Sequence, residues 1–274
     1  MRITVISLPF DKQRRIKIKD DLTSNDLEFT FSDAVYGKDL PADIKENLPL
    51  SSFLKRKSQK PTDGEIGCSF SHINVYKKLL ESNDEWICVL EDDVIIDKQF
   101  SIFIKQMDFS DLKPGALYLL GGQDGLNNRH KVVRAIKGHR YIGQQKFHRI
   151  VSGEQFIFRT CCYVLHRITA EKLISEFEDS FFVADEWAYF KTKGIIEDIY
   201  LSSFIHHPLD LSNSWIEKER VKKNSNFRKE DKSSFFKKII LFGKNRYTIK
   251  IKKIITLGFW YVRNKVVALR RFRE

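Results

Sequence analysis

The stretch WICVLEDDVIID, residues 86–97, constrains the fold more than any other part of the chain. Its apolar start predicts a buried strand, and the carboxylates Glu91, Asp92 and Asp93 follow directly at the end of that strand. Acids held within a few ångströms of one another repel unless a cation lies beside them. We therefore expect a cation site at a strand end, with a solvated acidic turn or helix N-terminus as the alternative.

Apolar runs and helical spacings alternate on both sides of this strand. Further strands are predicted at residues 3–8, 29–35, 115–122 and 161–166, and helices at residues 11–22, 63–82, 99–107 and 169–177. Asp63 is the candidate N-cap of the second helix. Residues 37–61 predict loops and short helices, and the polar residues 123–153 predict a mobile substrate loop. The alternation predicts an α/β sheet with its functional site at the carboxyl edge of the strands.

The length of 274 residues allows one large domain, or a domain with an appendage. The cysteines, Cys68, Cys88, Cys161 and Cys162, show no C-x-x-C spacing, and the adjacent pair suits a mutual disulfide poorly. We expect reduced core residues in a reducing compartment, which also argues against a zinc site. The opening MRITVISLPF lacks the pattern of a signal peptide, so we expect no export by that route.

The net charge of +12 is concentrated near the carboxyl terminus. Residues 233–274 hold 12 Lys and Arg against one acid, which is +11, and the first 232 residues contribute the remaining +1. The longest apolar run of this tail, Ile254–Val262, has nine residues, whereas a spanning helix needs about 20. We expect the tail to lie on an anionic membrane surface. The alternatives are a solvated extension and a nucleic-acid-binding arm, for which no recognition motif is present. The expected parts are a main domain at 1–216, a charged linker at 217–232 and a basic amphipathic tail at 233–274.

The acid cluster has the chemistry of a hard divalent cation site. Glu91 and Asp93 are two residues apart and can point to the same side of an extended chain, where Mg²⁺ or Mn²⁺ takes carboxylate, water and phosphate oxygens. Asp92 points elsewhere and can bind a sugar hydroxyl or brace the loop. A phosphatase of the Asp-x-Asp class needs a nucleophilic Asp in the first position, and this chain has Glu91 there. A metal-dependent phosphohydrolase is therefore disfavoured, and a binding protein with a structural acid cluster is the other alternative.

Several segments, taken in order, resemble glycosyltransferase family 25, which includes lipooligosaccharide galactosyltransferases of Gram-negative bacteria. The matching segments are VISLPFDKQRR, DAVYGKDL, GEIGCSFSHI, EDDV, TCCYVLHRITAEKL and VADEW, between Val5 and about Arg220. The resemblance implies a GT-A-type fold, a nucleotide-binding sheet flanked by helices. It also implies an inverting, metal-dependent transfer from a UDP-sugar: a β-galactosyltransferase that uses UDP-galactose, or a glucosyltransferase that uses UDP-glucose, with a lipooligosaccharide acceptor.

The resemblance also implies roles for individual residues. Mn²⁺ or Mg²⁺ would be held by Glu91 and Asp93 against the donor diphosphate, with His207, or else His206, completing the metal shell. Donor contacts would come from Ser7, Leu8, Pro9, Arg14 (or Arg15), Glu65, His72 and Asp92.

Inversion needs a base for the acceptor hydroxyl, and the resemblance assigns that role to Asp185 with Glu186 as the alternative. An N-cap is the other interpretation of this acid, because a helix is expected to follow it. Trp187 and Tyr189 either stack on a sugar or pack in the core. With the basic tail, these expectations place the protein in the cytoplasm, peripheral on the inner membrane, with no nucleic-acid partner.

Overall fold

The structure, a computed structural model, describes residues 1–210 and Glu219. The strands are β1 Arg2–Ser7, β2 Thr30–Asp33, β3 Trp86–Glu91, β4 Ala116–Gly121, β5 Val133–Arg134, β6 Arg140–Ile142, β7 Gln145–Ser152, β8 Cys162–His166 and β9 Asp198–Ile205. The α-helices are α1 Lys12–Ser24, α2 Ala42–Glu46, α3 Ser51–Lys57, α4 Asp63–Glu81, α5 Lys98–Gln106, α6 Arg167–Asp179 and α7 Trp187–Thr192. Apart from Glu219, the predicted linker and basic tail lie outside the described residues, so the expected domain boundaries stay a prediction.

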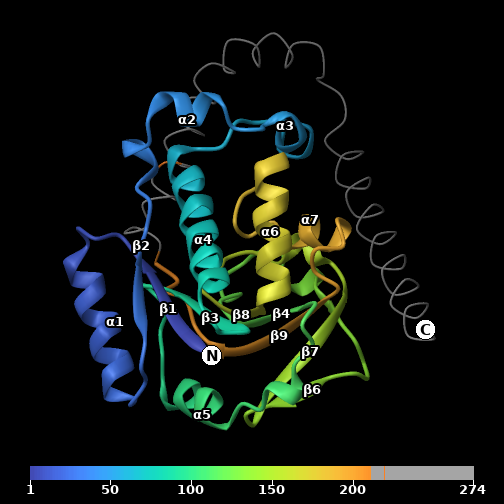
Figure 1. Cartoon of the computed structure of the whole chain (residues 1–274). Coiled ribbons are helices and arrows are strands. Elements are labelled where there is room, and N and C mark those ends of the chain that lie inside the picture. Colours follow the sequence, from blue (N-terminus) through green and yellow to red (C-terminus); the bar gives the residue numbers. More distant parts are fainter. Residues whose placement is uncertain (211–218, 220–274) are drawn as a thin grey trace, which may run out of the picture. The chain divides into compact units, whose positions relative to one another are not determined.

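The strands form one mixed sheet in the order β2-β1-β3-β8-β4-β9-β7-β5, with β6 paired to β7 (Figure 1). β1 is parallel to β2 and β3, while β8 is antiparallel to both β3 and β4. β9 is parallel to β4. The strands β2, β1, β3, β4 and β9 therefore all end at the same edge of the sheet, and β8 begins there.

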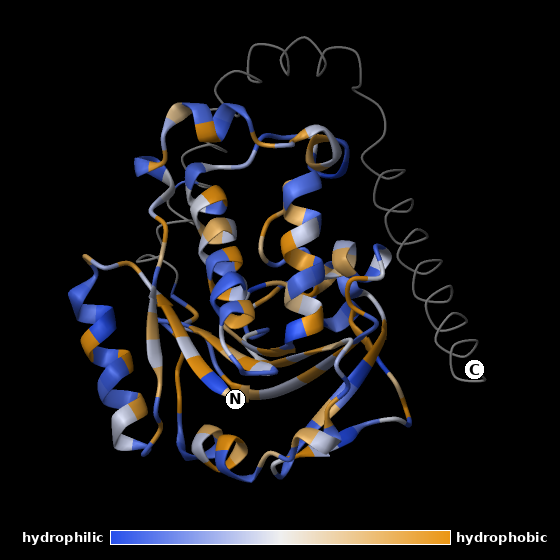
Figure 2. Ribbon diagram, in the orientation of Figure 1, coloured by the Kyte–Doolittle hydropathy of each residue, from blue (hydrophilic) through white to orange (hydrophobic). Residues whose placement is uncertain are grey.

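Two hydrophobic cores cover the two faces of this sheet, because side chains alternate along each strand. On β3, Ile87 and Val89 join the core shared with α4, α6 and α7, while Cys88 and Leu90 join the core shared with α1 and α5. Figure 1 shows α4 and α6 on one face and α5 on the other. In Figure 2 the ribbon of α1 is mainly hydrophilic, in agreement with only Ile18 and Leu22 being buried there. The predicted α/β sheet flanked by helices is confirmed.

The start of α4 differs by one residue from the prediction. Thr62, not Asp63, is the N-cap: its side chain accepts from the Glu65 nitrogen, and the Glu65 carboxylate accepts from the Thr62 nitrogen. Thr62 and Asp63 are alternative caps for the amides that have no partner at the start of the helix. The reciprocal hydrogen bonds between Thr62 and Glu65 satisfy two of these amides, which favours Thr62. Gly67 on this helix packs against the chain after β2, where an added Cβ would lie 2.5 Å from the Val35 carbonyl oxygen. The GEIGC segment is thus a tight packing site as well as a helix start.

The prediction of a mobile loop at residues 123–153 was wrong for its second half. β7 is an eight-residue strand that joins the sheet antiparallel to β9, and β5 and β6 pair with it. Alternate apolar side chains do occur there, since Phe147 is fully buried, but basic residues between them mask the pattern. The short helices expected between residues 37 and 61 are confirmed as α2 and α3. Among the described residues, no helix is long and apolar enough to cross a membrane.

Candidate active site

Strand ends and loops gather at one edge of the sheet. Ser7 ends β1, Glu91 ends β3, Gly121 ends β4 and Ile205 ends β9, and the residues before β8 arrive at the same edge because β8 is antiparallel. The residues predicted from the sequence to form the site therefore lie at the edge of the sheet where four strands end.

Glu91, Asp93 and His207 lie together at this edge. One ligand atom of each lies within 4.8 Å of the others, and His207 Nε2 is 3.6 Å from Asp93 Oδ1. Glu91 is the last residue of β3, and Asp93 follows in the turn, so the two carboxylates point to one place while Asp92 points away. His207 follows β9, and His206 is directed elsewhere, to Asp124. The structure thus brings together the three residues predicted as metal ligands.

The two carboxylates of this group are buried close together, so ionising both of them is unfavourable. Burial, and then the negative charge of Glu91, raise the pKa of Asp93 to about 6. Burial also opposes ionisation of Glu91, but His72 and the Thr160 hydroxyl outweigh it and hold the pKa of Glu91 below its ordinary value. Asp93 Oδ1 is buried without a hydrogen-bond partner. Arg14 pairs with the other oxygen of Asp93 at 3.4 Å, but a buried carboxylate oxygen without a hydrogen bond still fits a cation, because such a group is costly to bury.

The ligand set favours a hard ion. The two carboxylates suit Mg²⁺ or Mn²⁺, which take oxygen ligands and leave positions for phosphate, whereas the imidazole by itself suits a softer ion such as Zn²⁺. A second group, Cys68, His72 and Glu91, also has ligand atoms within 4.8 Å of one another. Its thiol is a soft ligand, so this second group does not suit the same ions. All four cysteines are free, as expected.

Asp92 connects the first strand to the acid cluster. Its Oδ2 accepts from Ser7 Oγ at 2.6 Å, and its Oδ1 accepts from Arg14 Nη1 at 3.1 Å. The same Arg14 nitrogen lies 3.4 Å from Asp93 Oδ2. Arg14 reaches the acids because α1 starts right after β1: Asp11 caps the helix by accepting from the Arg14 nitrogen. Arg15, the alternative donor contact, instead binds the Ser7 carbonyl at 2.9 Å and the Asp33 carboxylate.

The other predicted donor residues lie in two places. Leu8 is half-buried and its carbonyl accepts from the Asp11 nitrogen, while Pro9 is exposed in the turn before α1. Glu65 lies at the start of α4, where its carboxylate belongs to the capping box. Its predicted contact with the donor therefore competes with a structural role.

His72 is fixed from behind by a chain of buried hydroxyls. Its Nδ1 is 2.7 Å from the Tyr163 hydroxyl, which is 2.7 Å from the Tyr76 hydroxyl. Its Nε2 faces Glu91 Oε1 at 3.8 Å and has no hydrogen-bond partner, although it is buried. This arrangement aims one ring nitrogen at the group of Glu91, Asp93 and His207. The neighbouring Ser71 has a structural role, since it bridges the Gly67 carbonyl and the Val35 nitrogen.

Arg159 and Thr160, which the sequence prediction missed, join the cluster to the predicted base. Thr160 Oγ1 donates to Glu91, and the Arg159 nitrogen donates to Asp185 Oδ2 at 3.0 Å. The Arg159 guanidinium binds the carbonyls of Gly122 and Asp124 at 2.7 and 2.9 Å. The only signal in the sequence was that Arg159 and Thr160 come just before the CCYVLH strand. That position indicates the site only once β8 is known to be antiparallel, because residues before β8 then lie at the edge where β3 ends.

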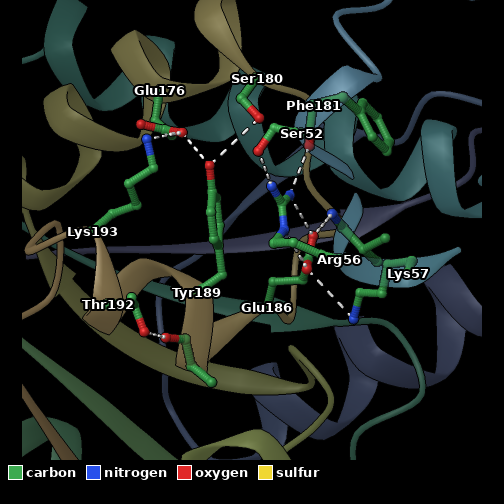
Figure 3. A network of polar contacts seen from close by, with 12 residues as sticks. Ser52, Arg56, Lys57, Glu176, Ser180, Phe181, Glu186, Tyr189, Thr192 and Lys193 are labelled. Atoms are coloured by element: carbon green, nitrogen blue, oxygen red, sulfur yellow. Dashed lines mark hydrogen bonds and ion pairs between the residues drawn. The ribbon is translucent and has the colours of Figure 1, made fainter. Parts of the chain in front are cut away.

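Glu186, the alternative base, is held in an ion-pair network (Figure 3). Arg56 contacts both of its carboxylate oxygens at 3.3 Å, Lys57 lies 3.4 Å away, and the Val183 nitrogen donates to it at 3.0 Å. Its side chain is only 4% exposed, so these partners meet a buried charge. Figure 3 also shows Tyr189 beside Arg56, whose guanidinium lies 3.6 Å from the ring centre.

Trp187, one of the two candidates for stacking on a sugar, is fully buried against Tyr163 and Phe190. Its ring is therefore a core element and offers no face to a substrate. The ring packs in the core, as the alternative interpretation expected, because it faces Tyr163 on β8.

The comparison with protein families identifies one family for this chain. The model of glycosyltransferase family 25 (LPS biosynthesis protein) matches residues 1–188. A Haemophilus influenzae protein provisionally named a glycosyltransferase is 25% identical over 251 residues, 88% of this chain and 86% of that protein. Procollagen galactosyltransferase 1-B of Xenopus laevis is 34% identical over 108 residues, 38% of this chain but only 17% of that protein. Among solved structures, a glycosyltransferase involved in glycosylation of the major capsid of PBCV-1 superposes with a TM-score of 0.37 at 12% identity, over 76% of this chain and 93% of the other.

Proposed function

The chain belongs to glycosyltransferase family 25, and from that premise we propose that it transfers galactose from UDP-galactose to a sugar of a lipooligosaccharide, with inversion and with Mn²⁺ or Mg²⁺. The observation that carries the proposal is the group of Glu91, Asp93 and His207 beside the Asp92–Ser7–Arg14 network. The first group has the ligands of a hard cation, and the second has a guanidinium for a diphosphate.

Each group of residues has a role in this proposal. Glu91, Asp93 and His207 hold the metal, which when bound neutralises charge on the departing nucleoside diphosphate. Asp92 keeps Ser7 and Arg14 in place in the absence of donor. Arg14 lies 3.1 Å from Asp92 and 3.4 Å from Asp93. Its planar guanidinium is therefore near enough to bind a phosphate oxygen of the donor.

The acceptor hydroxyl needs a base on the side of the donor sugar away from the diphosphate. We propose Asp185, which is half-buried and held by Arg159, one residue from the Thr160 that contacts Glu91. Glu186 is the weaker candidate, because two cations and a main-chain nitrogen already bind its carboxylate. A proton taken by Asp185 leaves the acceptor oxygen free to attack the anomeric carbon from the face opposite the leaving group.

The galactose assignment rests on family resemblance and on the names of relatives such as the procollagen galactosyltransferases, so UDP-glucose is the alternative donor. A single side chain can decide between an axial and an equatorial hydroxyl. The proposed place of action is the cytoplasmic face of the inner membrane, with residues 233–274 on anionic lipid, since that segment carries 12 Lys and Arg against one acid.

The test is release of UDP from a panel of UDP-sugars, with Mn²⁺ or with EDTA, with and without lipooligosaccharide. Wild type is compared with Asp93→Ala and with Asp20→Ala, which changes an acid on the exposed side of α1. We expect one sugar to be turned over, only with metal, by wild type and Asp20→Ala but not by Asp93→Ala. Equal turnover in EDTA would remove the metal role. Phosphate release from simple esters would favour a phosphohydrolase instead, and no turnover of any sugar would favour a binding protein.

A further inference from the structure

A cavity of about 290 Å³ lies farther along the same sheet edge, away from β1. Its walls are the turn after β4, the segment before β5 and one stretch of β9. The lining residues used below are Gln123, Asp124, Arg129, His130, Arg134 and Ser203. The volume is at the small end of ligand pockets, which span about 300–1,000 Å³, so it suits a sugar residue better than a nucleotide sugar.

The cavity is positive on balance. Its one acid, Asp124, is met by Arg129 at 3.1 Å and by His206 at 2.8 Å. Arg134 is exposed and makes no hydrogen bond or ion pair with residues 1–210 or Glu219 that would use its charge, and the exposed His130 also lines the cavity. Ser203, which is exposed, adds a hydroxyl to the lining, whereas the Gln123 amide is held by the Phe158 main chain through both its nitrogen and its oxygen.

The segment that contains Arg129, His130 and Arg134 adds further positive charge around the cavity. Residues 125–153 hold seven Lys and Arg and no Asp or Glu. His148 on β7 responds to it: burial first, and then the charges of Arg134 and Lys146, hold the pKa of His148 below its ordinary value. A surface with one sign of charge attracts a ligand of the opposite sign.

The cavity is linked to the metal cluster through two short connections. Asp124, on its wall, contacts His206, the neighbour of the metal-site residue His207. Arg159 holds the carbonyls of Gly122 and Asp124 with its side chain and Asp185 with its main chain. A ligand in the cavity therefore lies on the side of the proposed base, where an acceptor must be.

We propose that this cavity binds the acceptor through an anionic group, so that the acceptor is a saccharide carrying a carboxylate or a phosphate near the hydroxyl that is glycosylated. This inference rests on the proposed function. Arg134 is suited to the anion, because a guanidinium binds carboxylate and phosphate through paired hydrogen bonds. The Ser203 hydroxyl suits a sugar hydroxyl.

The experiment is calorimetric titration of the full chain, without donor, at constant ionic strength. The probes are glucuronate, glucose 6-phosphate, neutral glucose and inorganic phosphate. The variants are Arg134→Gln and His130→Gln in the cavity, with Lys137→Gln as the matched control, a cation of the same segment that does not line it. We expect at least one sugar anion to bind, and Arg134→Gln to weaken it about tenfold. His130→Gln should weaken it less and Lys137→Gln less than about twofold.

Each outcome decides the matter. Binding of glucuronate alone identifies a carboxylate sugar, and binding of glucose 6-phosphate alone identifies a phosphorylated one; both support the proposal. Equal binding of neutral glucose, equal binding of inorganic phosphate, or equal losses in Arg134→Gln and Lys137→Gln would overturn it. Since no donor is present, turnover of a UDP-sugar without anion binding defeats this inference alone. Anion binding without turnover of any sugar defeats the proposed function alone.

Discussion

The main-chain nitrogen of Arg159 donates a 3.0 Å hydrogen bond to the Asp185 carboxylate from a left-handed backbone, with φ of 69°. Such a conformation costs a residue with a side chain about 1 kcal/mol or more, and it persists only where contacts enforce it. Here Trp187 Nε1 donates to the Arg159 carbonyl and the guanidinium binds the turn after β4. We infer that Arg159 is a positioning residue for Asp185.

Replacing Arg159 by Gly and by Ala separates strain from positioning. Arg159→Gly removes the guanidinium but adopts φ of 69° freely, so it should be more stable than Arg159→Ala by about 1 kcal/mol. Both variants lose the guanidinium that fixes this stretch of main chain, so the nitrogen that holds Asp185 should shift. We therefore expect kcat to fall about tenfold or more, with a smaller change in KM for the donor, because the proposed metal ligands are not altered. Urea unfolding and initial rates measure the two effects. A wild-type kcat in Arg159→Gly would show that the side chain has no positioning role.

Asp185→Asn and Glu186→Gln distinguish a base from a structural acid. Asp185→Asn should lower kcat by about 10²–10⁴-fold with little change in melting temperature. Glu186→Gln leaves Arg56 and Lys57 beside a neutral group in a buried site and should cost about 3 kcal/mol of stability. Its kcat, corrected for the folded fraction, should stay within about threefold of wild type. The reverse pattern would make Glu186 the base.

Much of the fold was predictable, because it depends on local patterns. The run WICVL predicts a buried strand from composition alone, and the spacing of Ile66, Ile73 and Tyr76 predicts α4. The direction of β8 was not predictable, since a strand reads the same in a parallel or an antiparallel ladder. Arg159 and Thr160 therefore stayed hidden, although they contact two predicted site residues.

The predicted site residues follow the same distinction between local patterns, which are predictable, and long-range pairing, which is not. Residues adjacent to strand ends, such as Ser7, Asp92 and Asp93, meet at one edge because strand ends must. The partner of Asp93 from β9, His207, came from family resemblance, because its distance in sequence carries no spacing signal. The strand β7 was missed because cations alternate with its buried residues.

Asp93→Asn should stabilise the protein in the absence of metal. The folded-state pKa of Asp93 is about 6, above its ordinary value of 3.8, so the protonated form favours folding. Its contribution to stability is fully present below pH about 4 and is lost as pH rises through 6. In EDTA, the melting temperature of Asp93→Asn should exceed that of wild type by a few degrees at pH 7, roughly 1 kcal/mol or more, and by less at pH 4.5.

Added Mn²⁺ reverses the order at pH 7, because the ion binds the two carboxylates of wild type and stabilises the folded state. It should not raise the melting temperature of Asp93→Asn. Asp20→Asn, on the exposed side of α1, should behave as wild type under every condition. If Asp93→Asn and Asp20→Asn had the same melting curve in EDTA at all pH values, the carboxylate would not be under electrostatic strain.

Tyr163→Phe and Tyr76→Phe test whether the buried hydroxyl chain orients His72. Tyr76→Phe breaks one 2.7 Å hydrogen bond in the core and should cost about 1 kcal/mol of stability, whereas Tyr163→Phe breaks two and should cost about 2 kcal/mol. Only Tyr163→Phe deprives His72 Nδ1 of its partner, which frees the ring to turn or change tautomer and moves Nε2 away from Glu91. Tyr163→Phe should therefore weaken Mn²⁺ binding about tenfold, by analogy with losses of outer-shell partners, whereas Tyr76→Phe should change it less than about twofold. Equal Mn²⁺ affinities for the two variants, measured by calorimetry on the folded proteins, would mean that the hydroxyl chain serves stability alone.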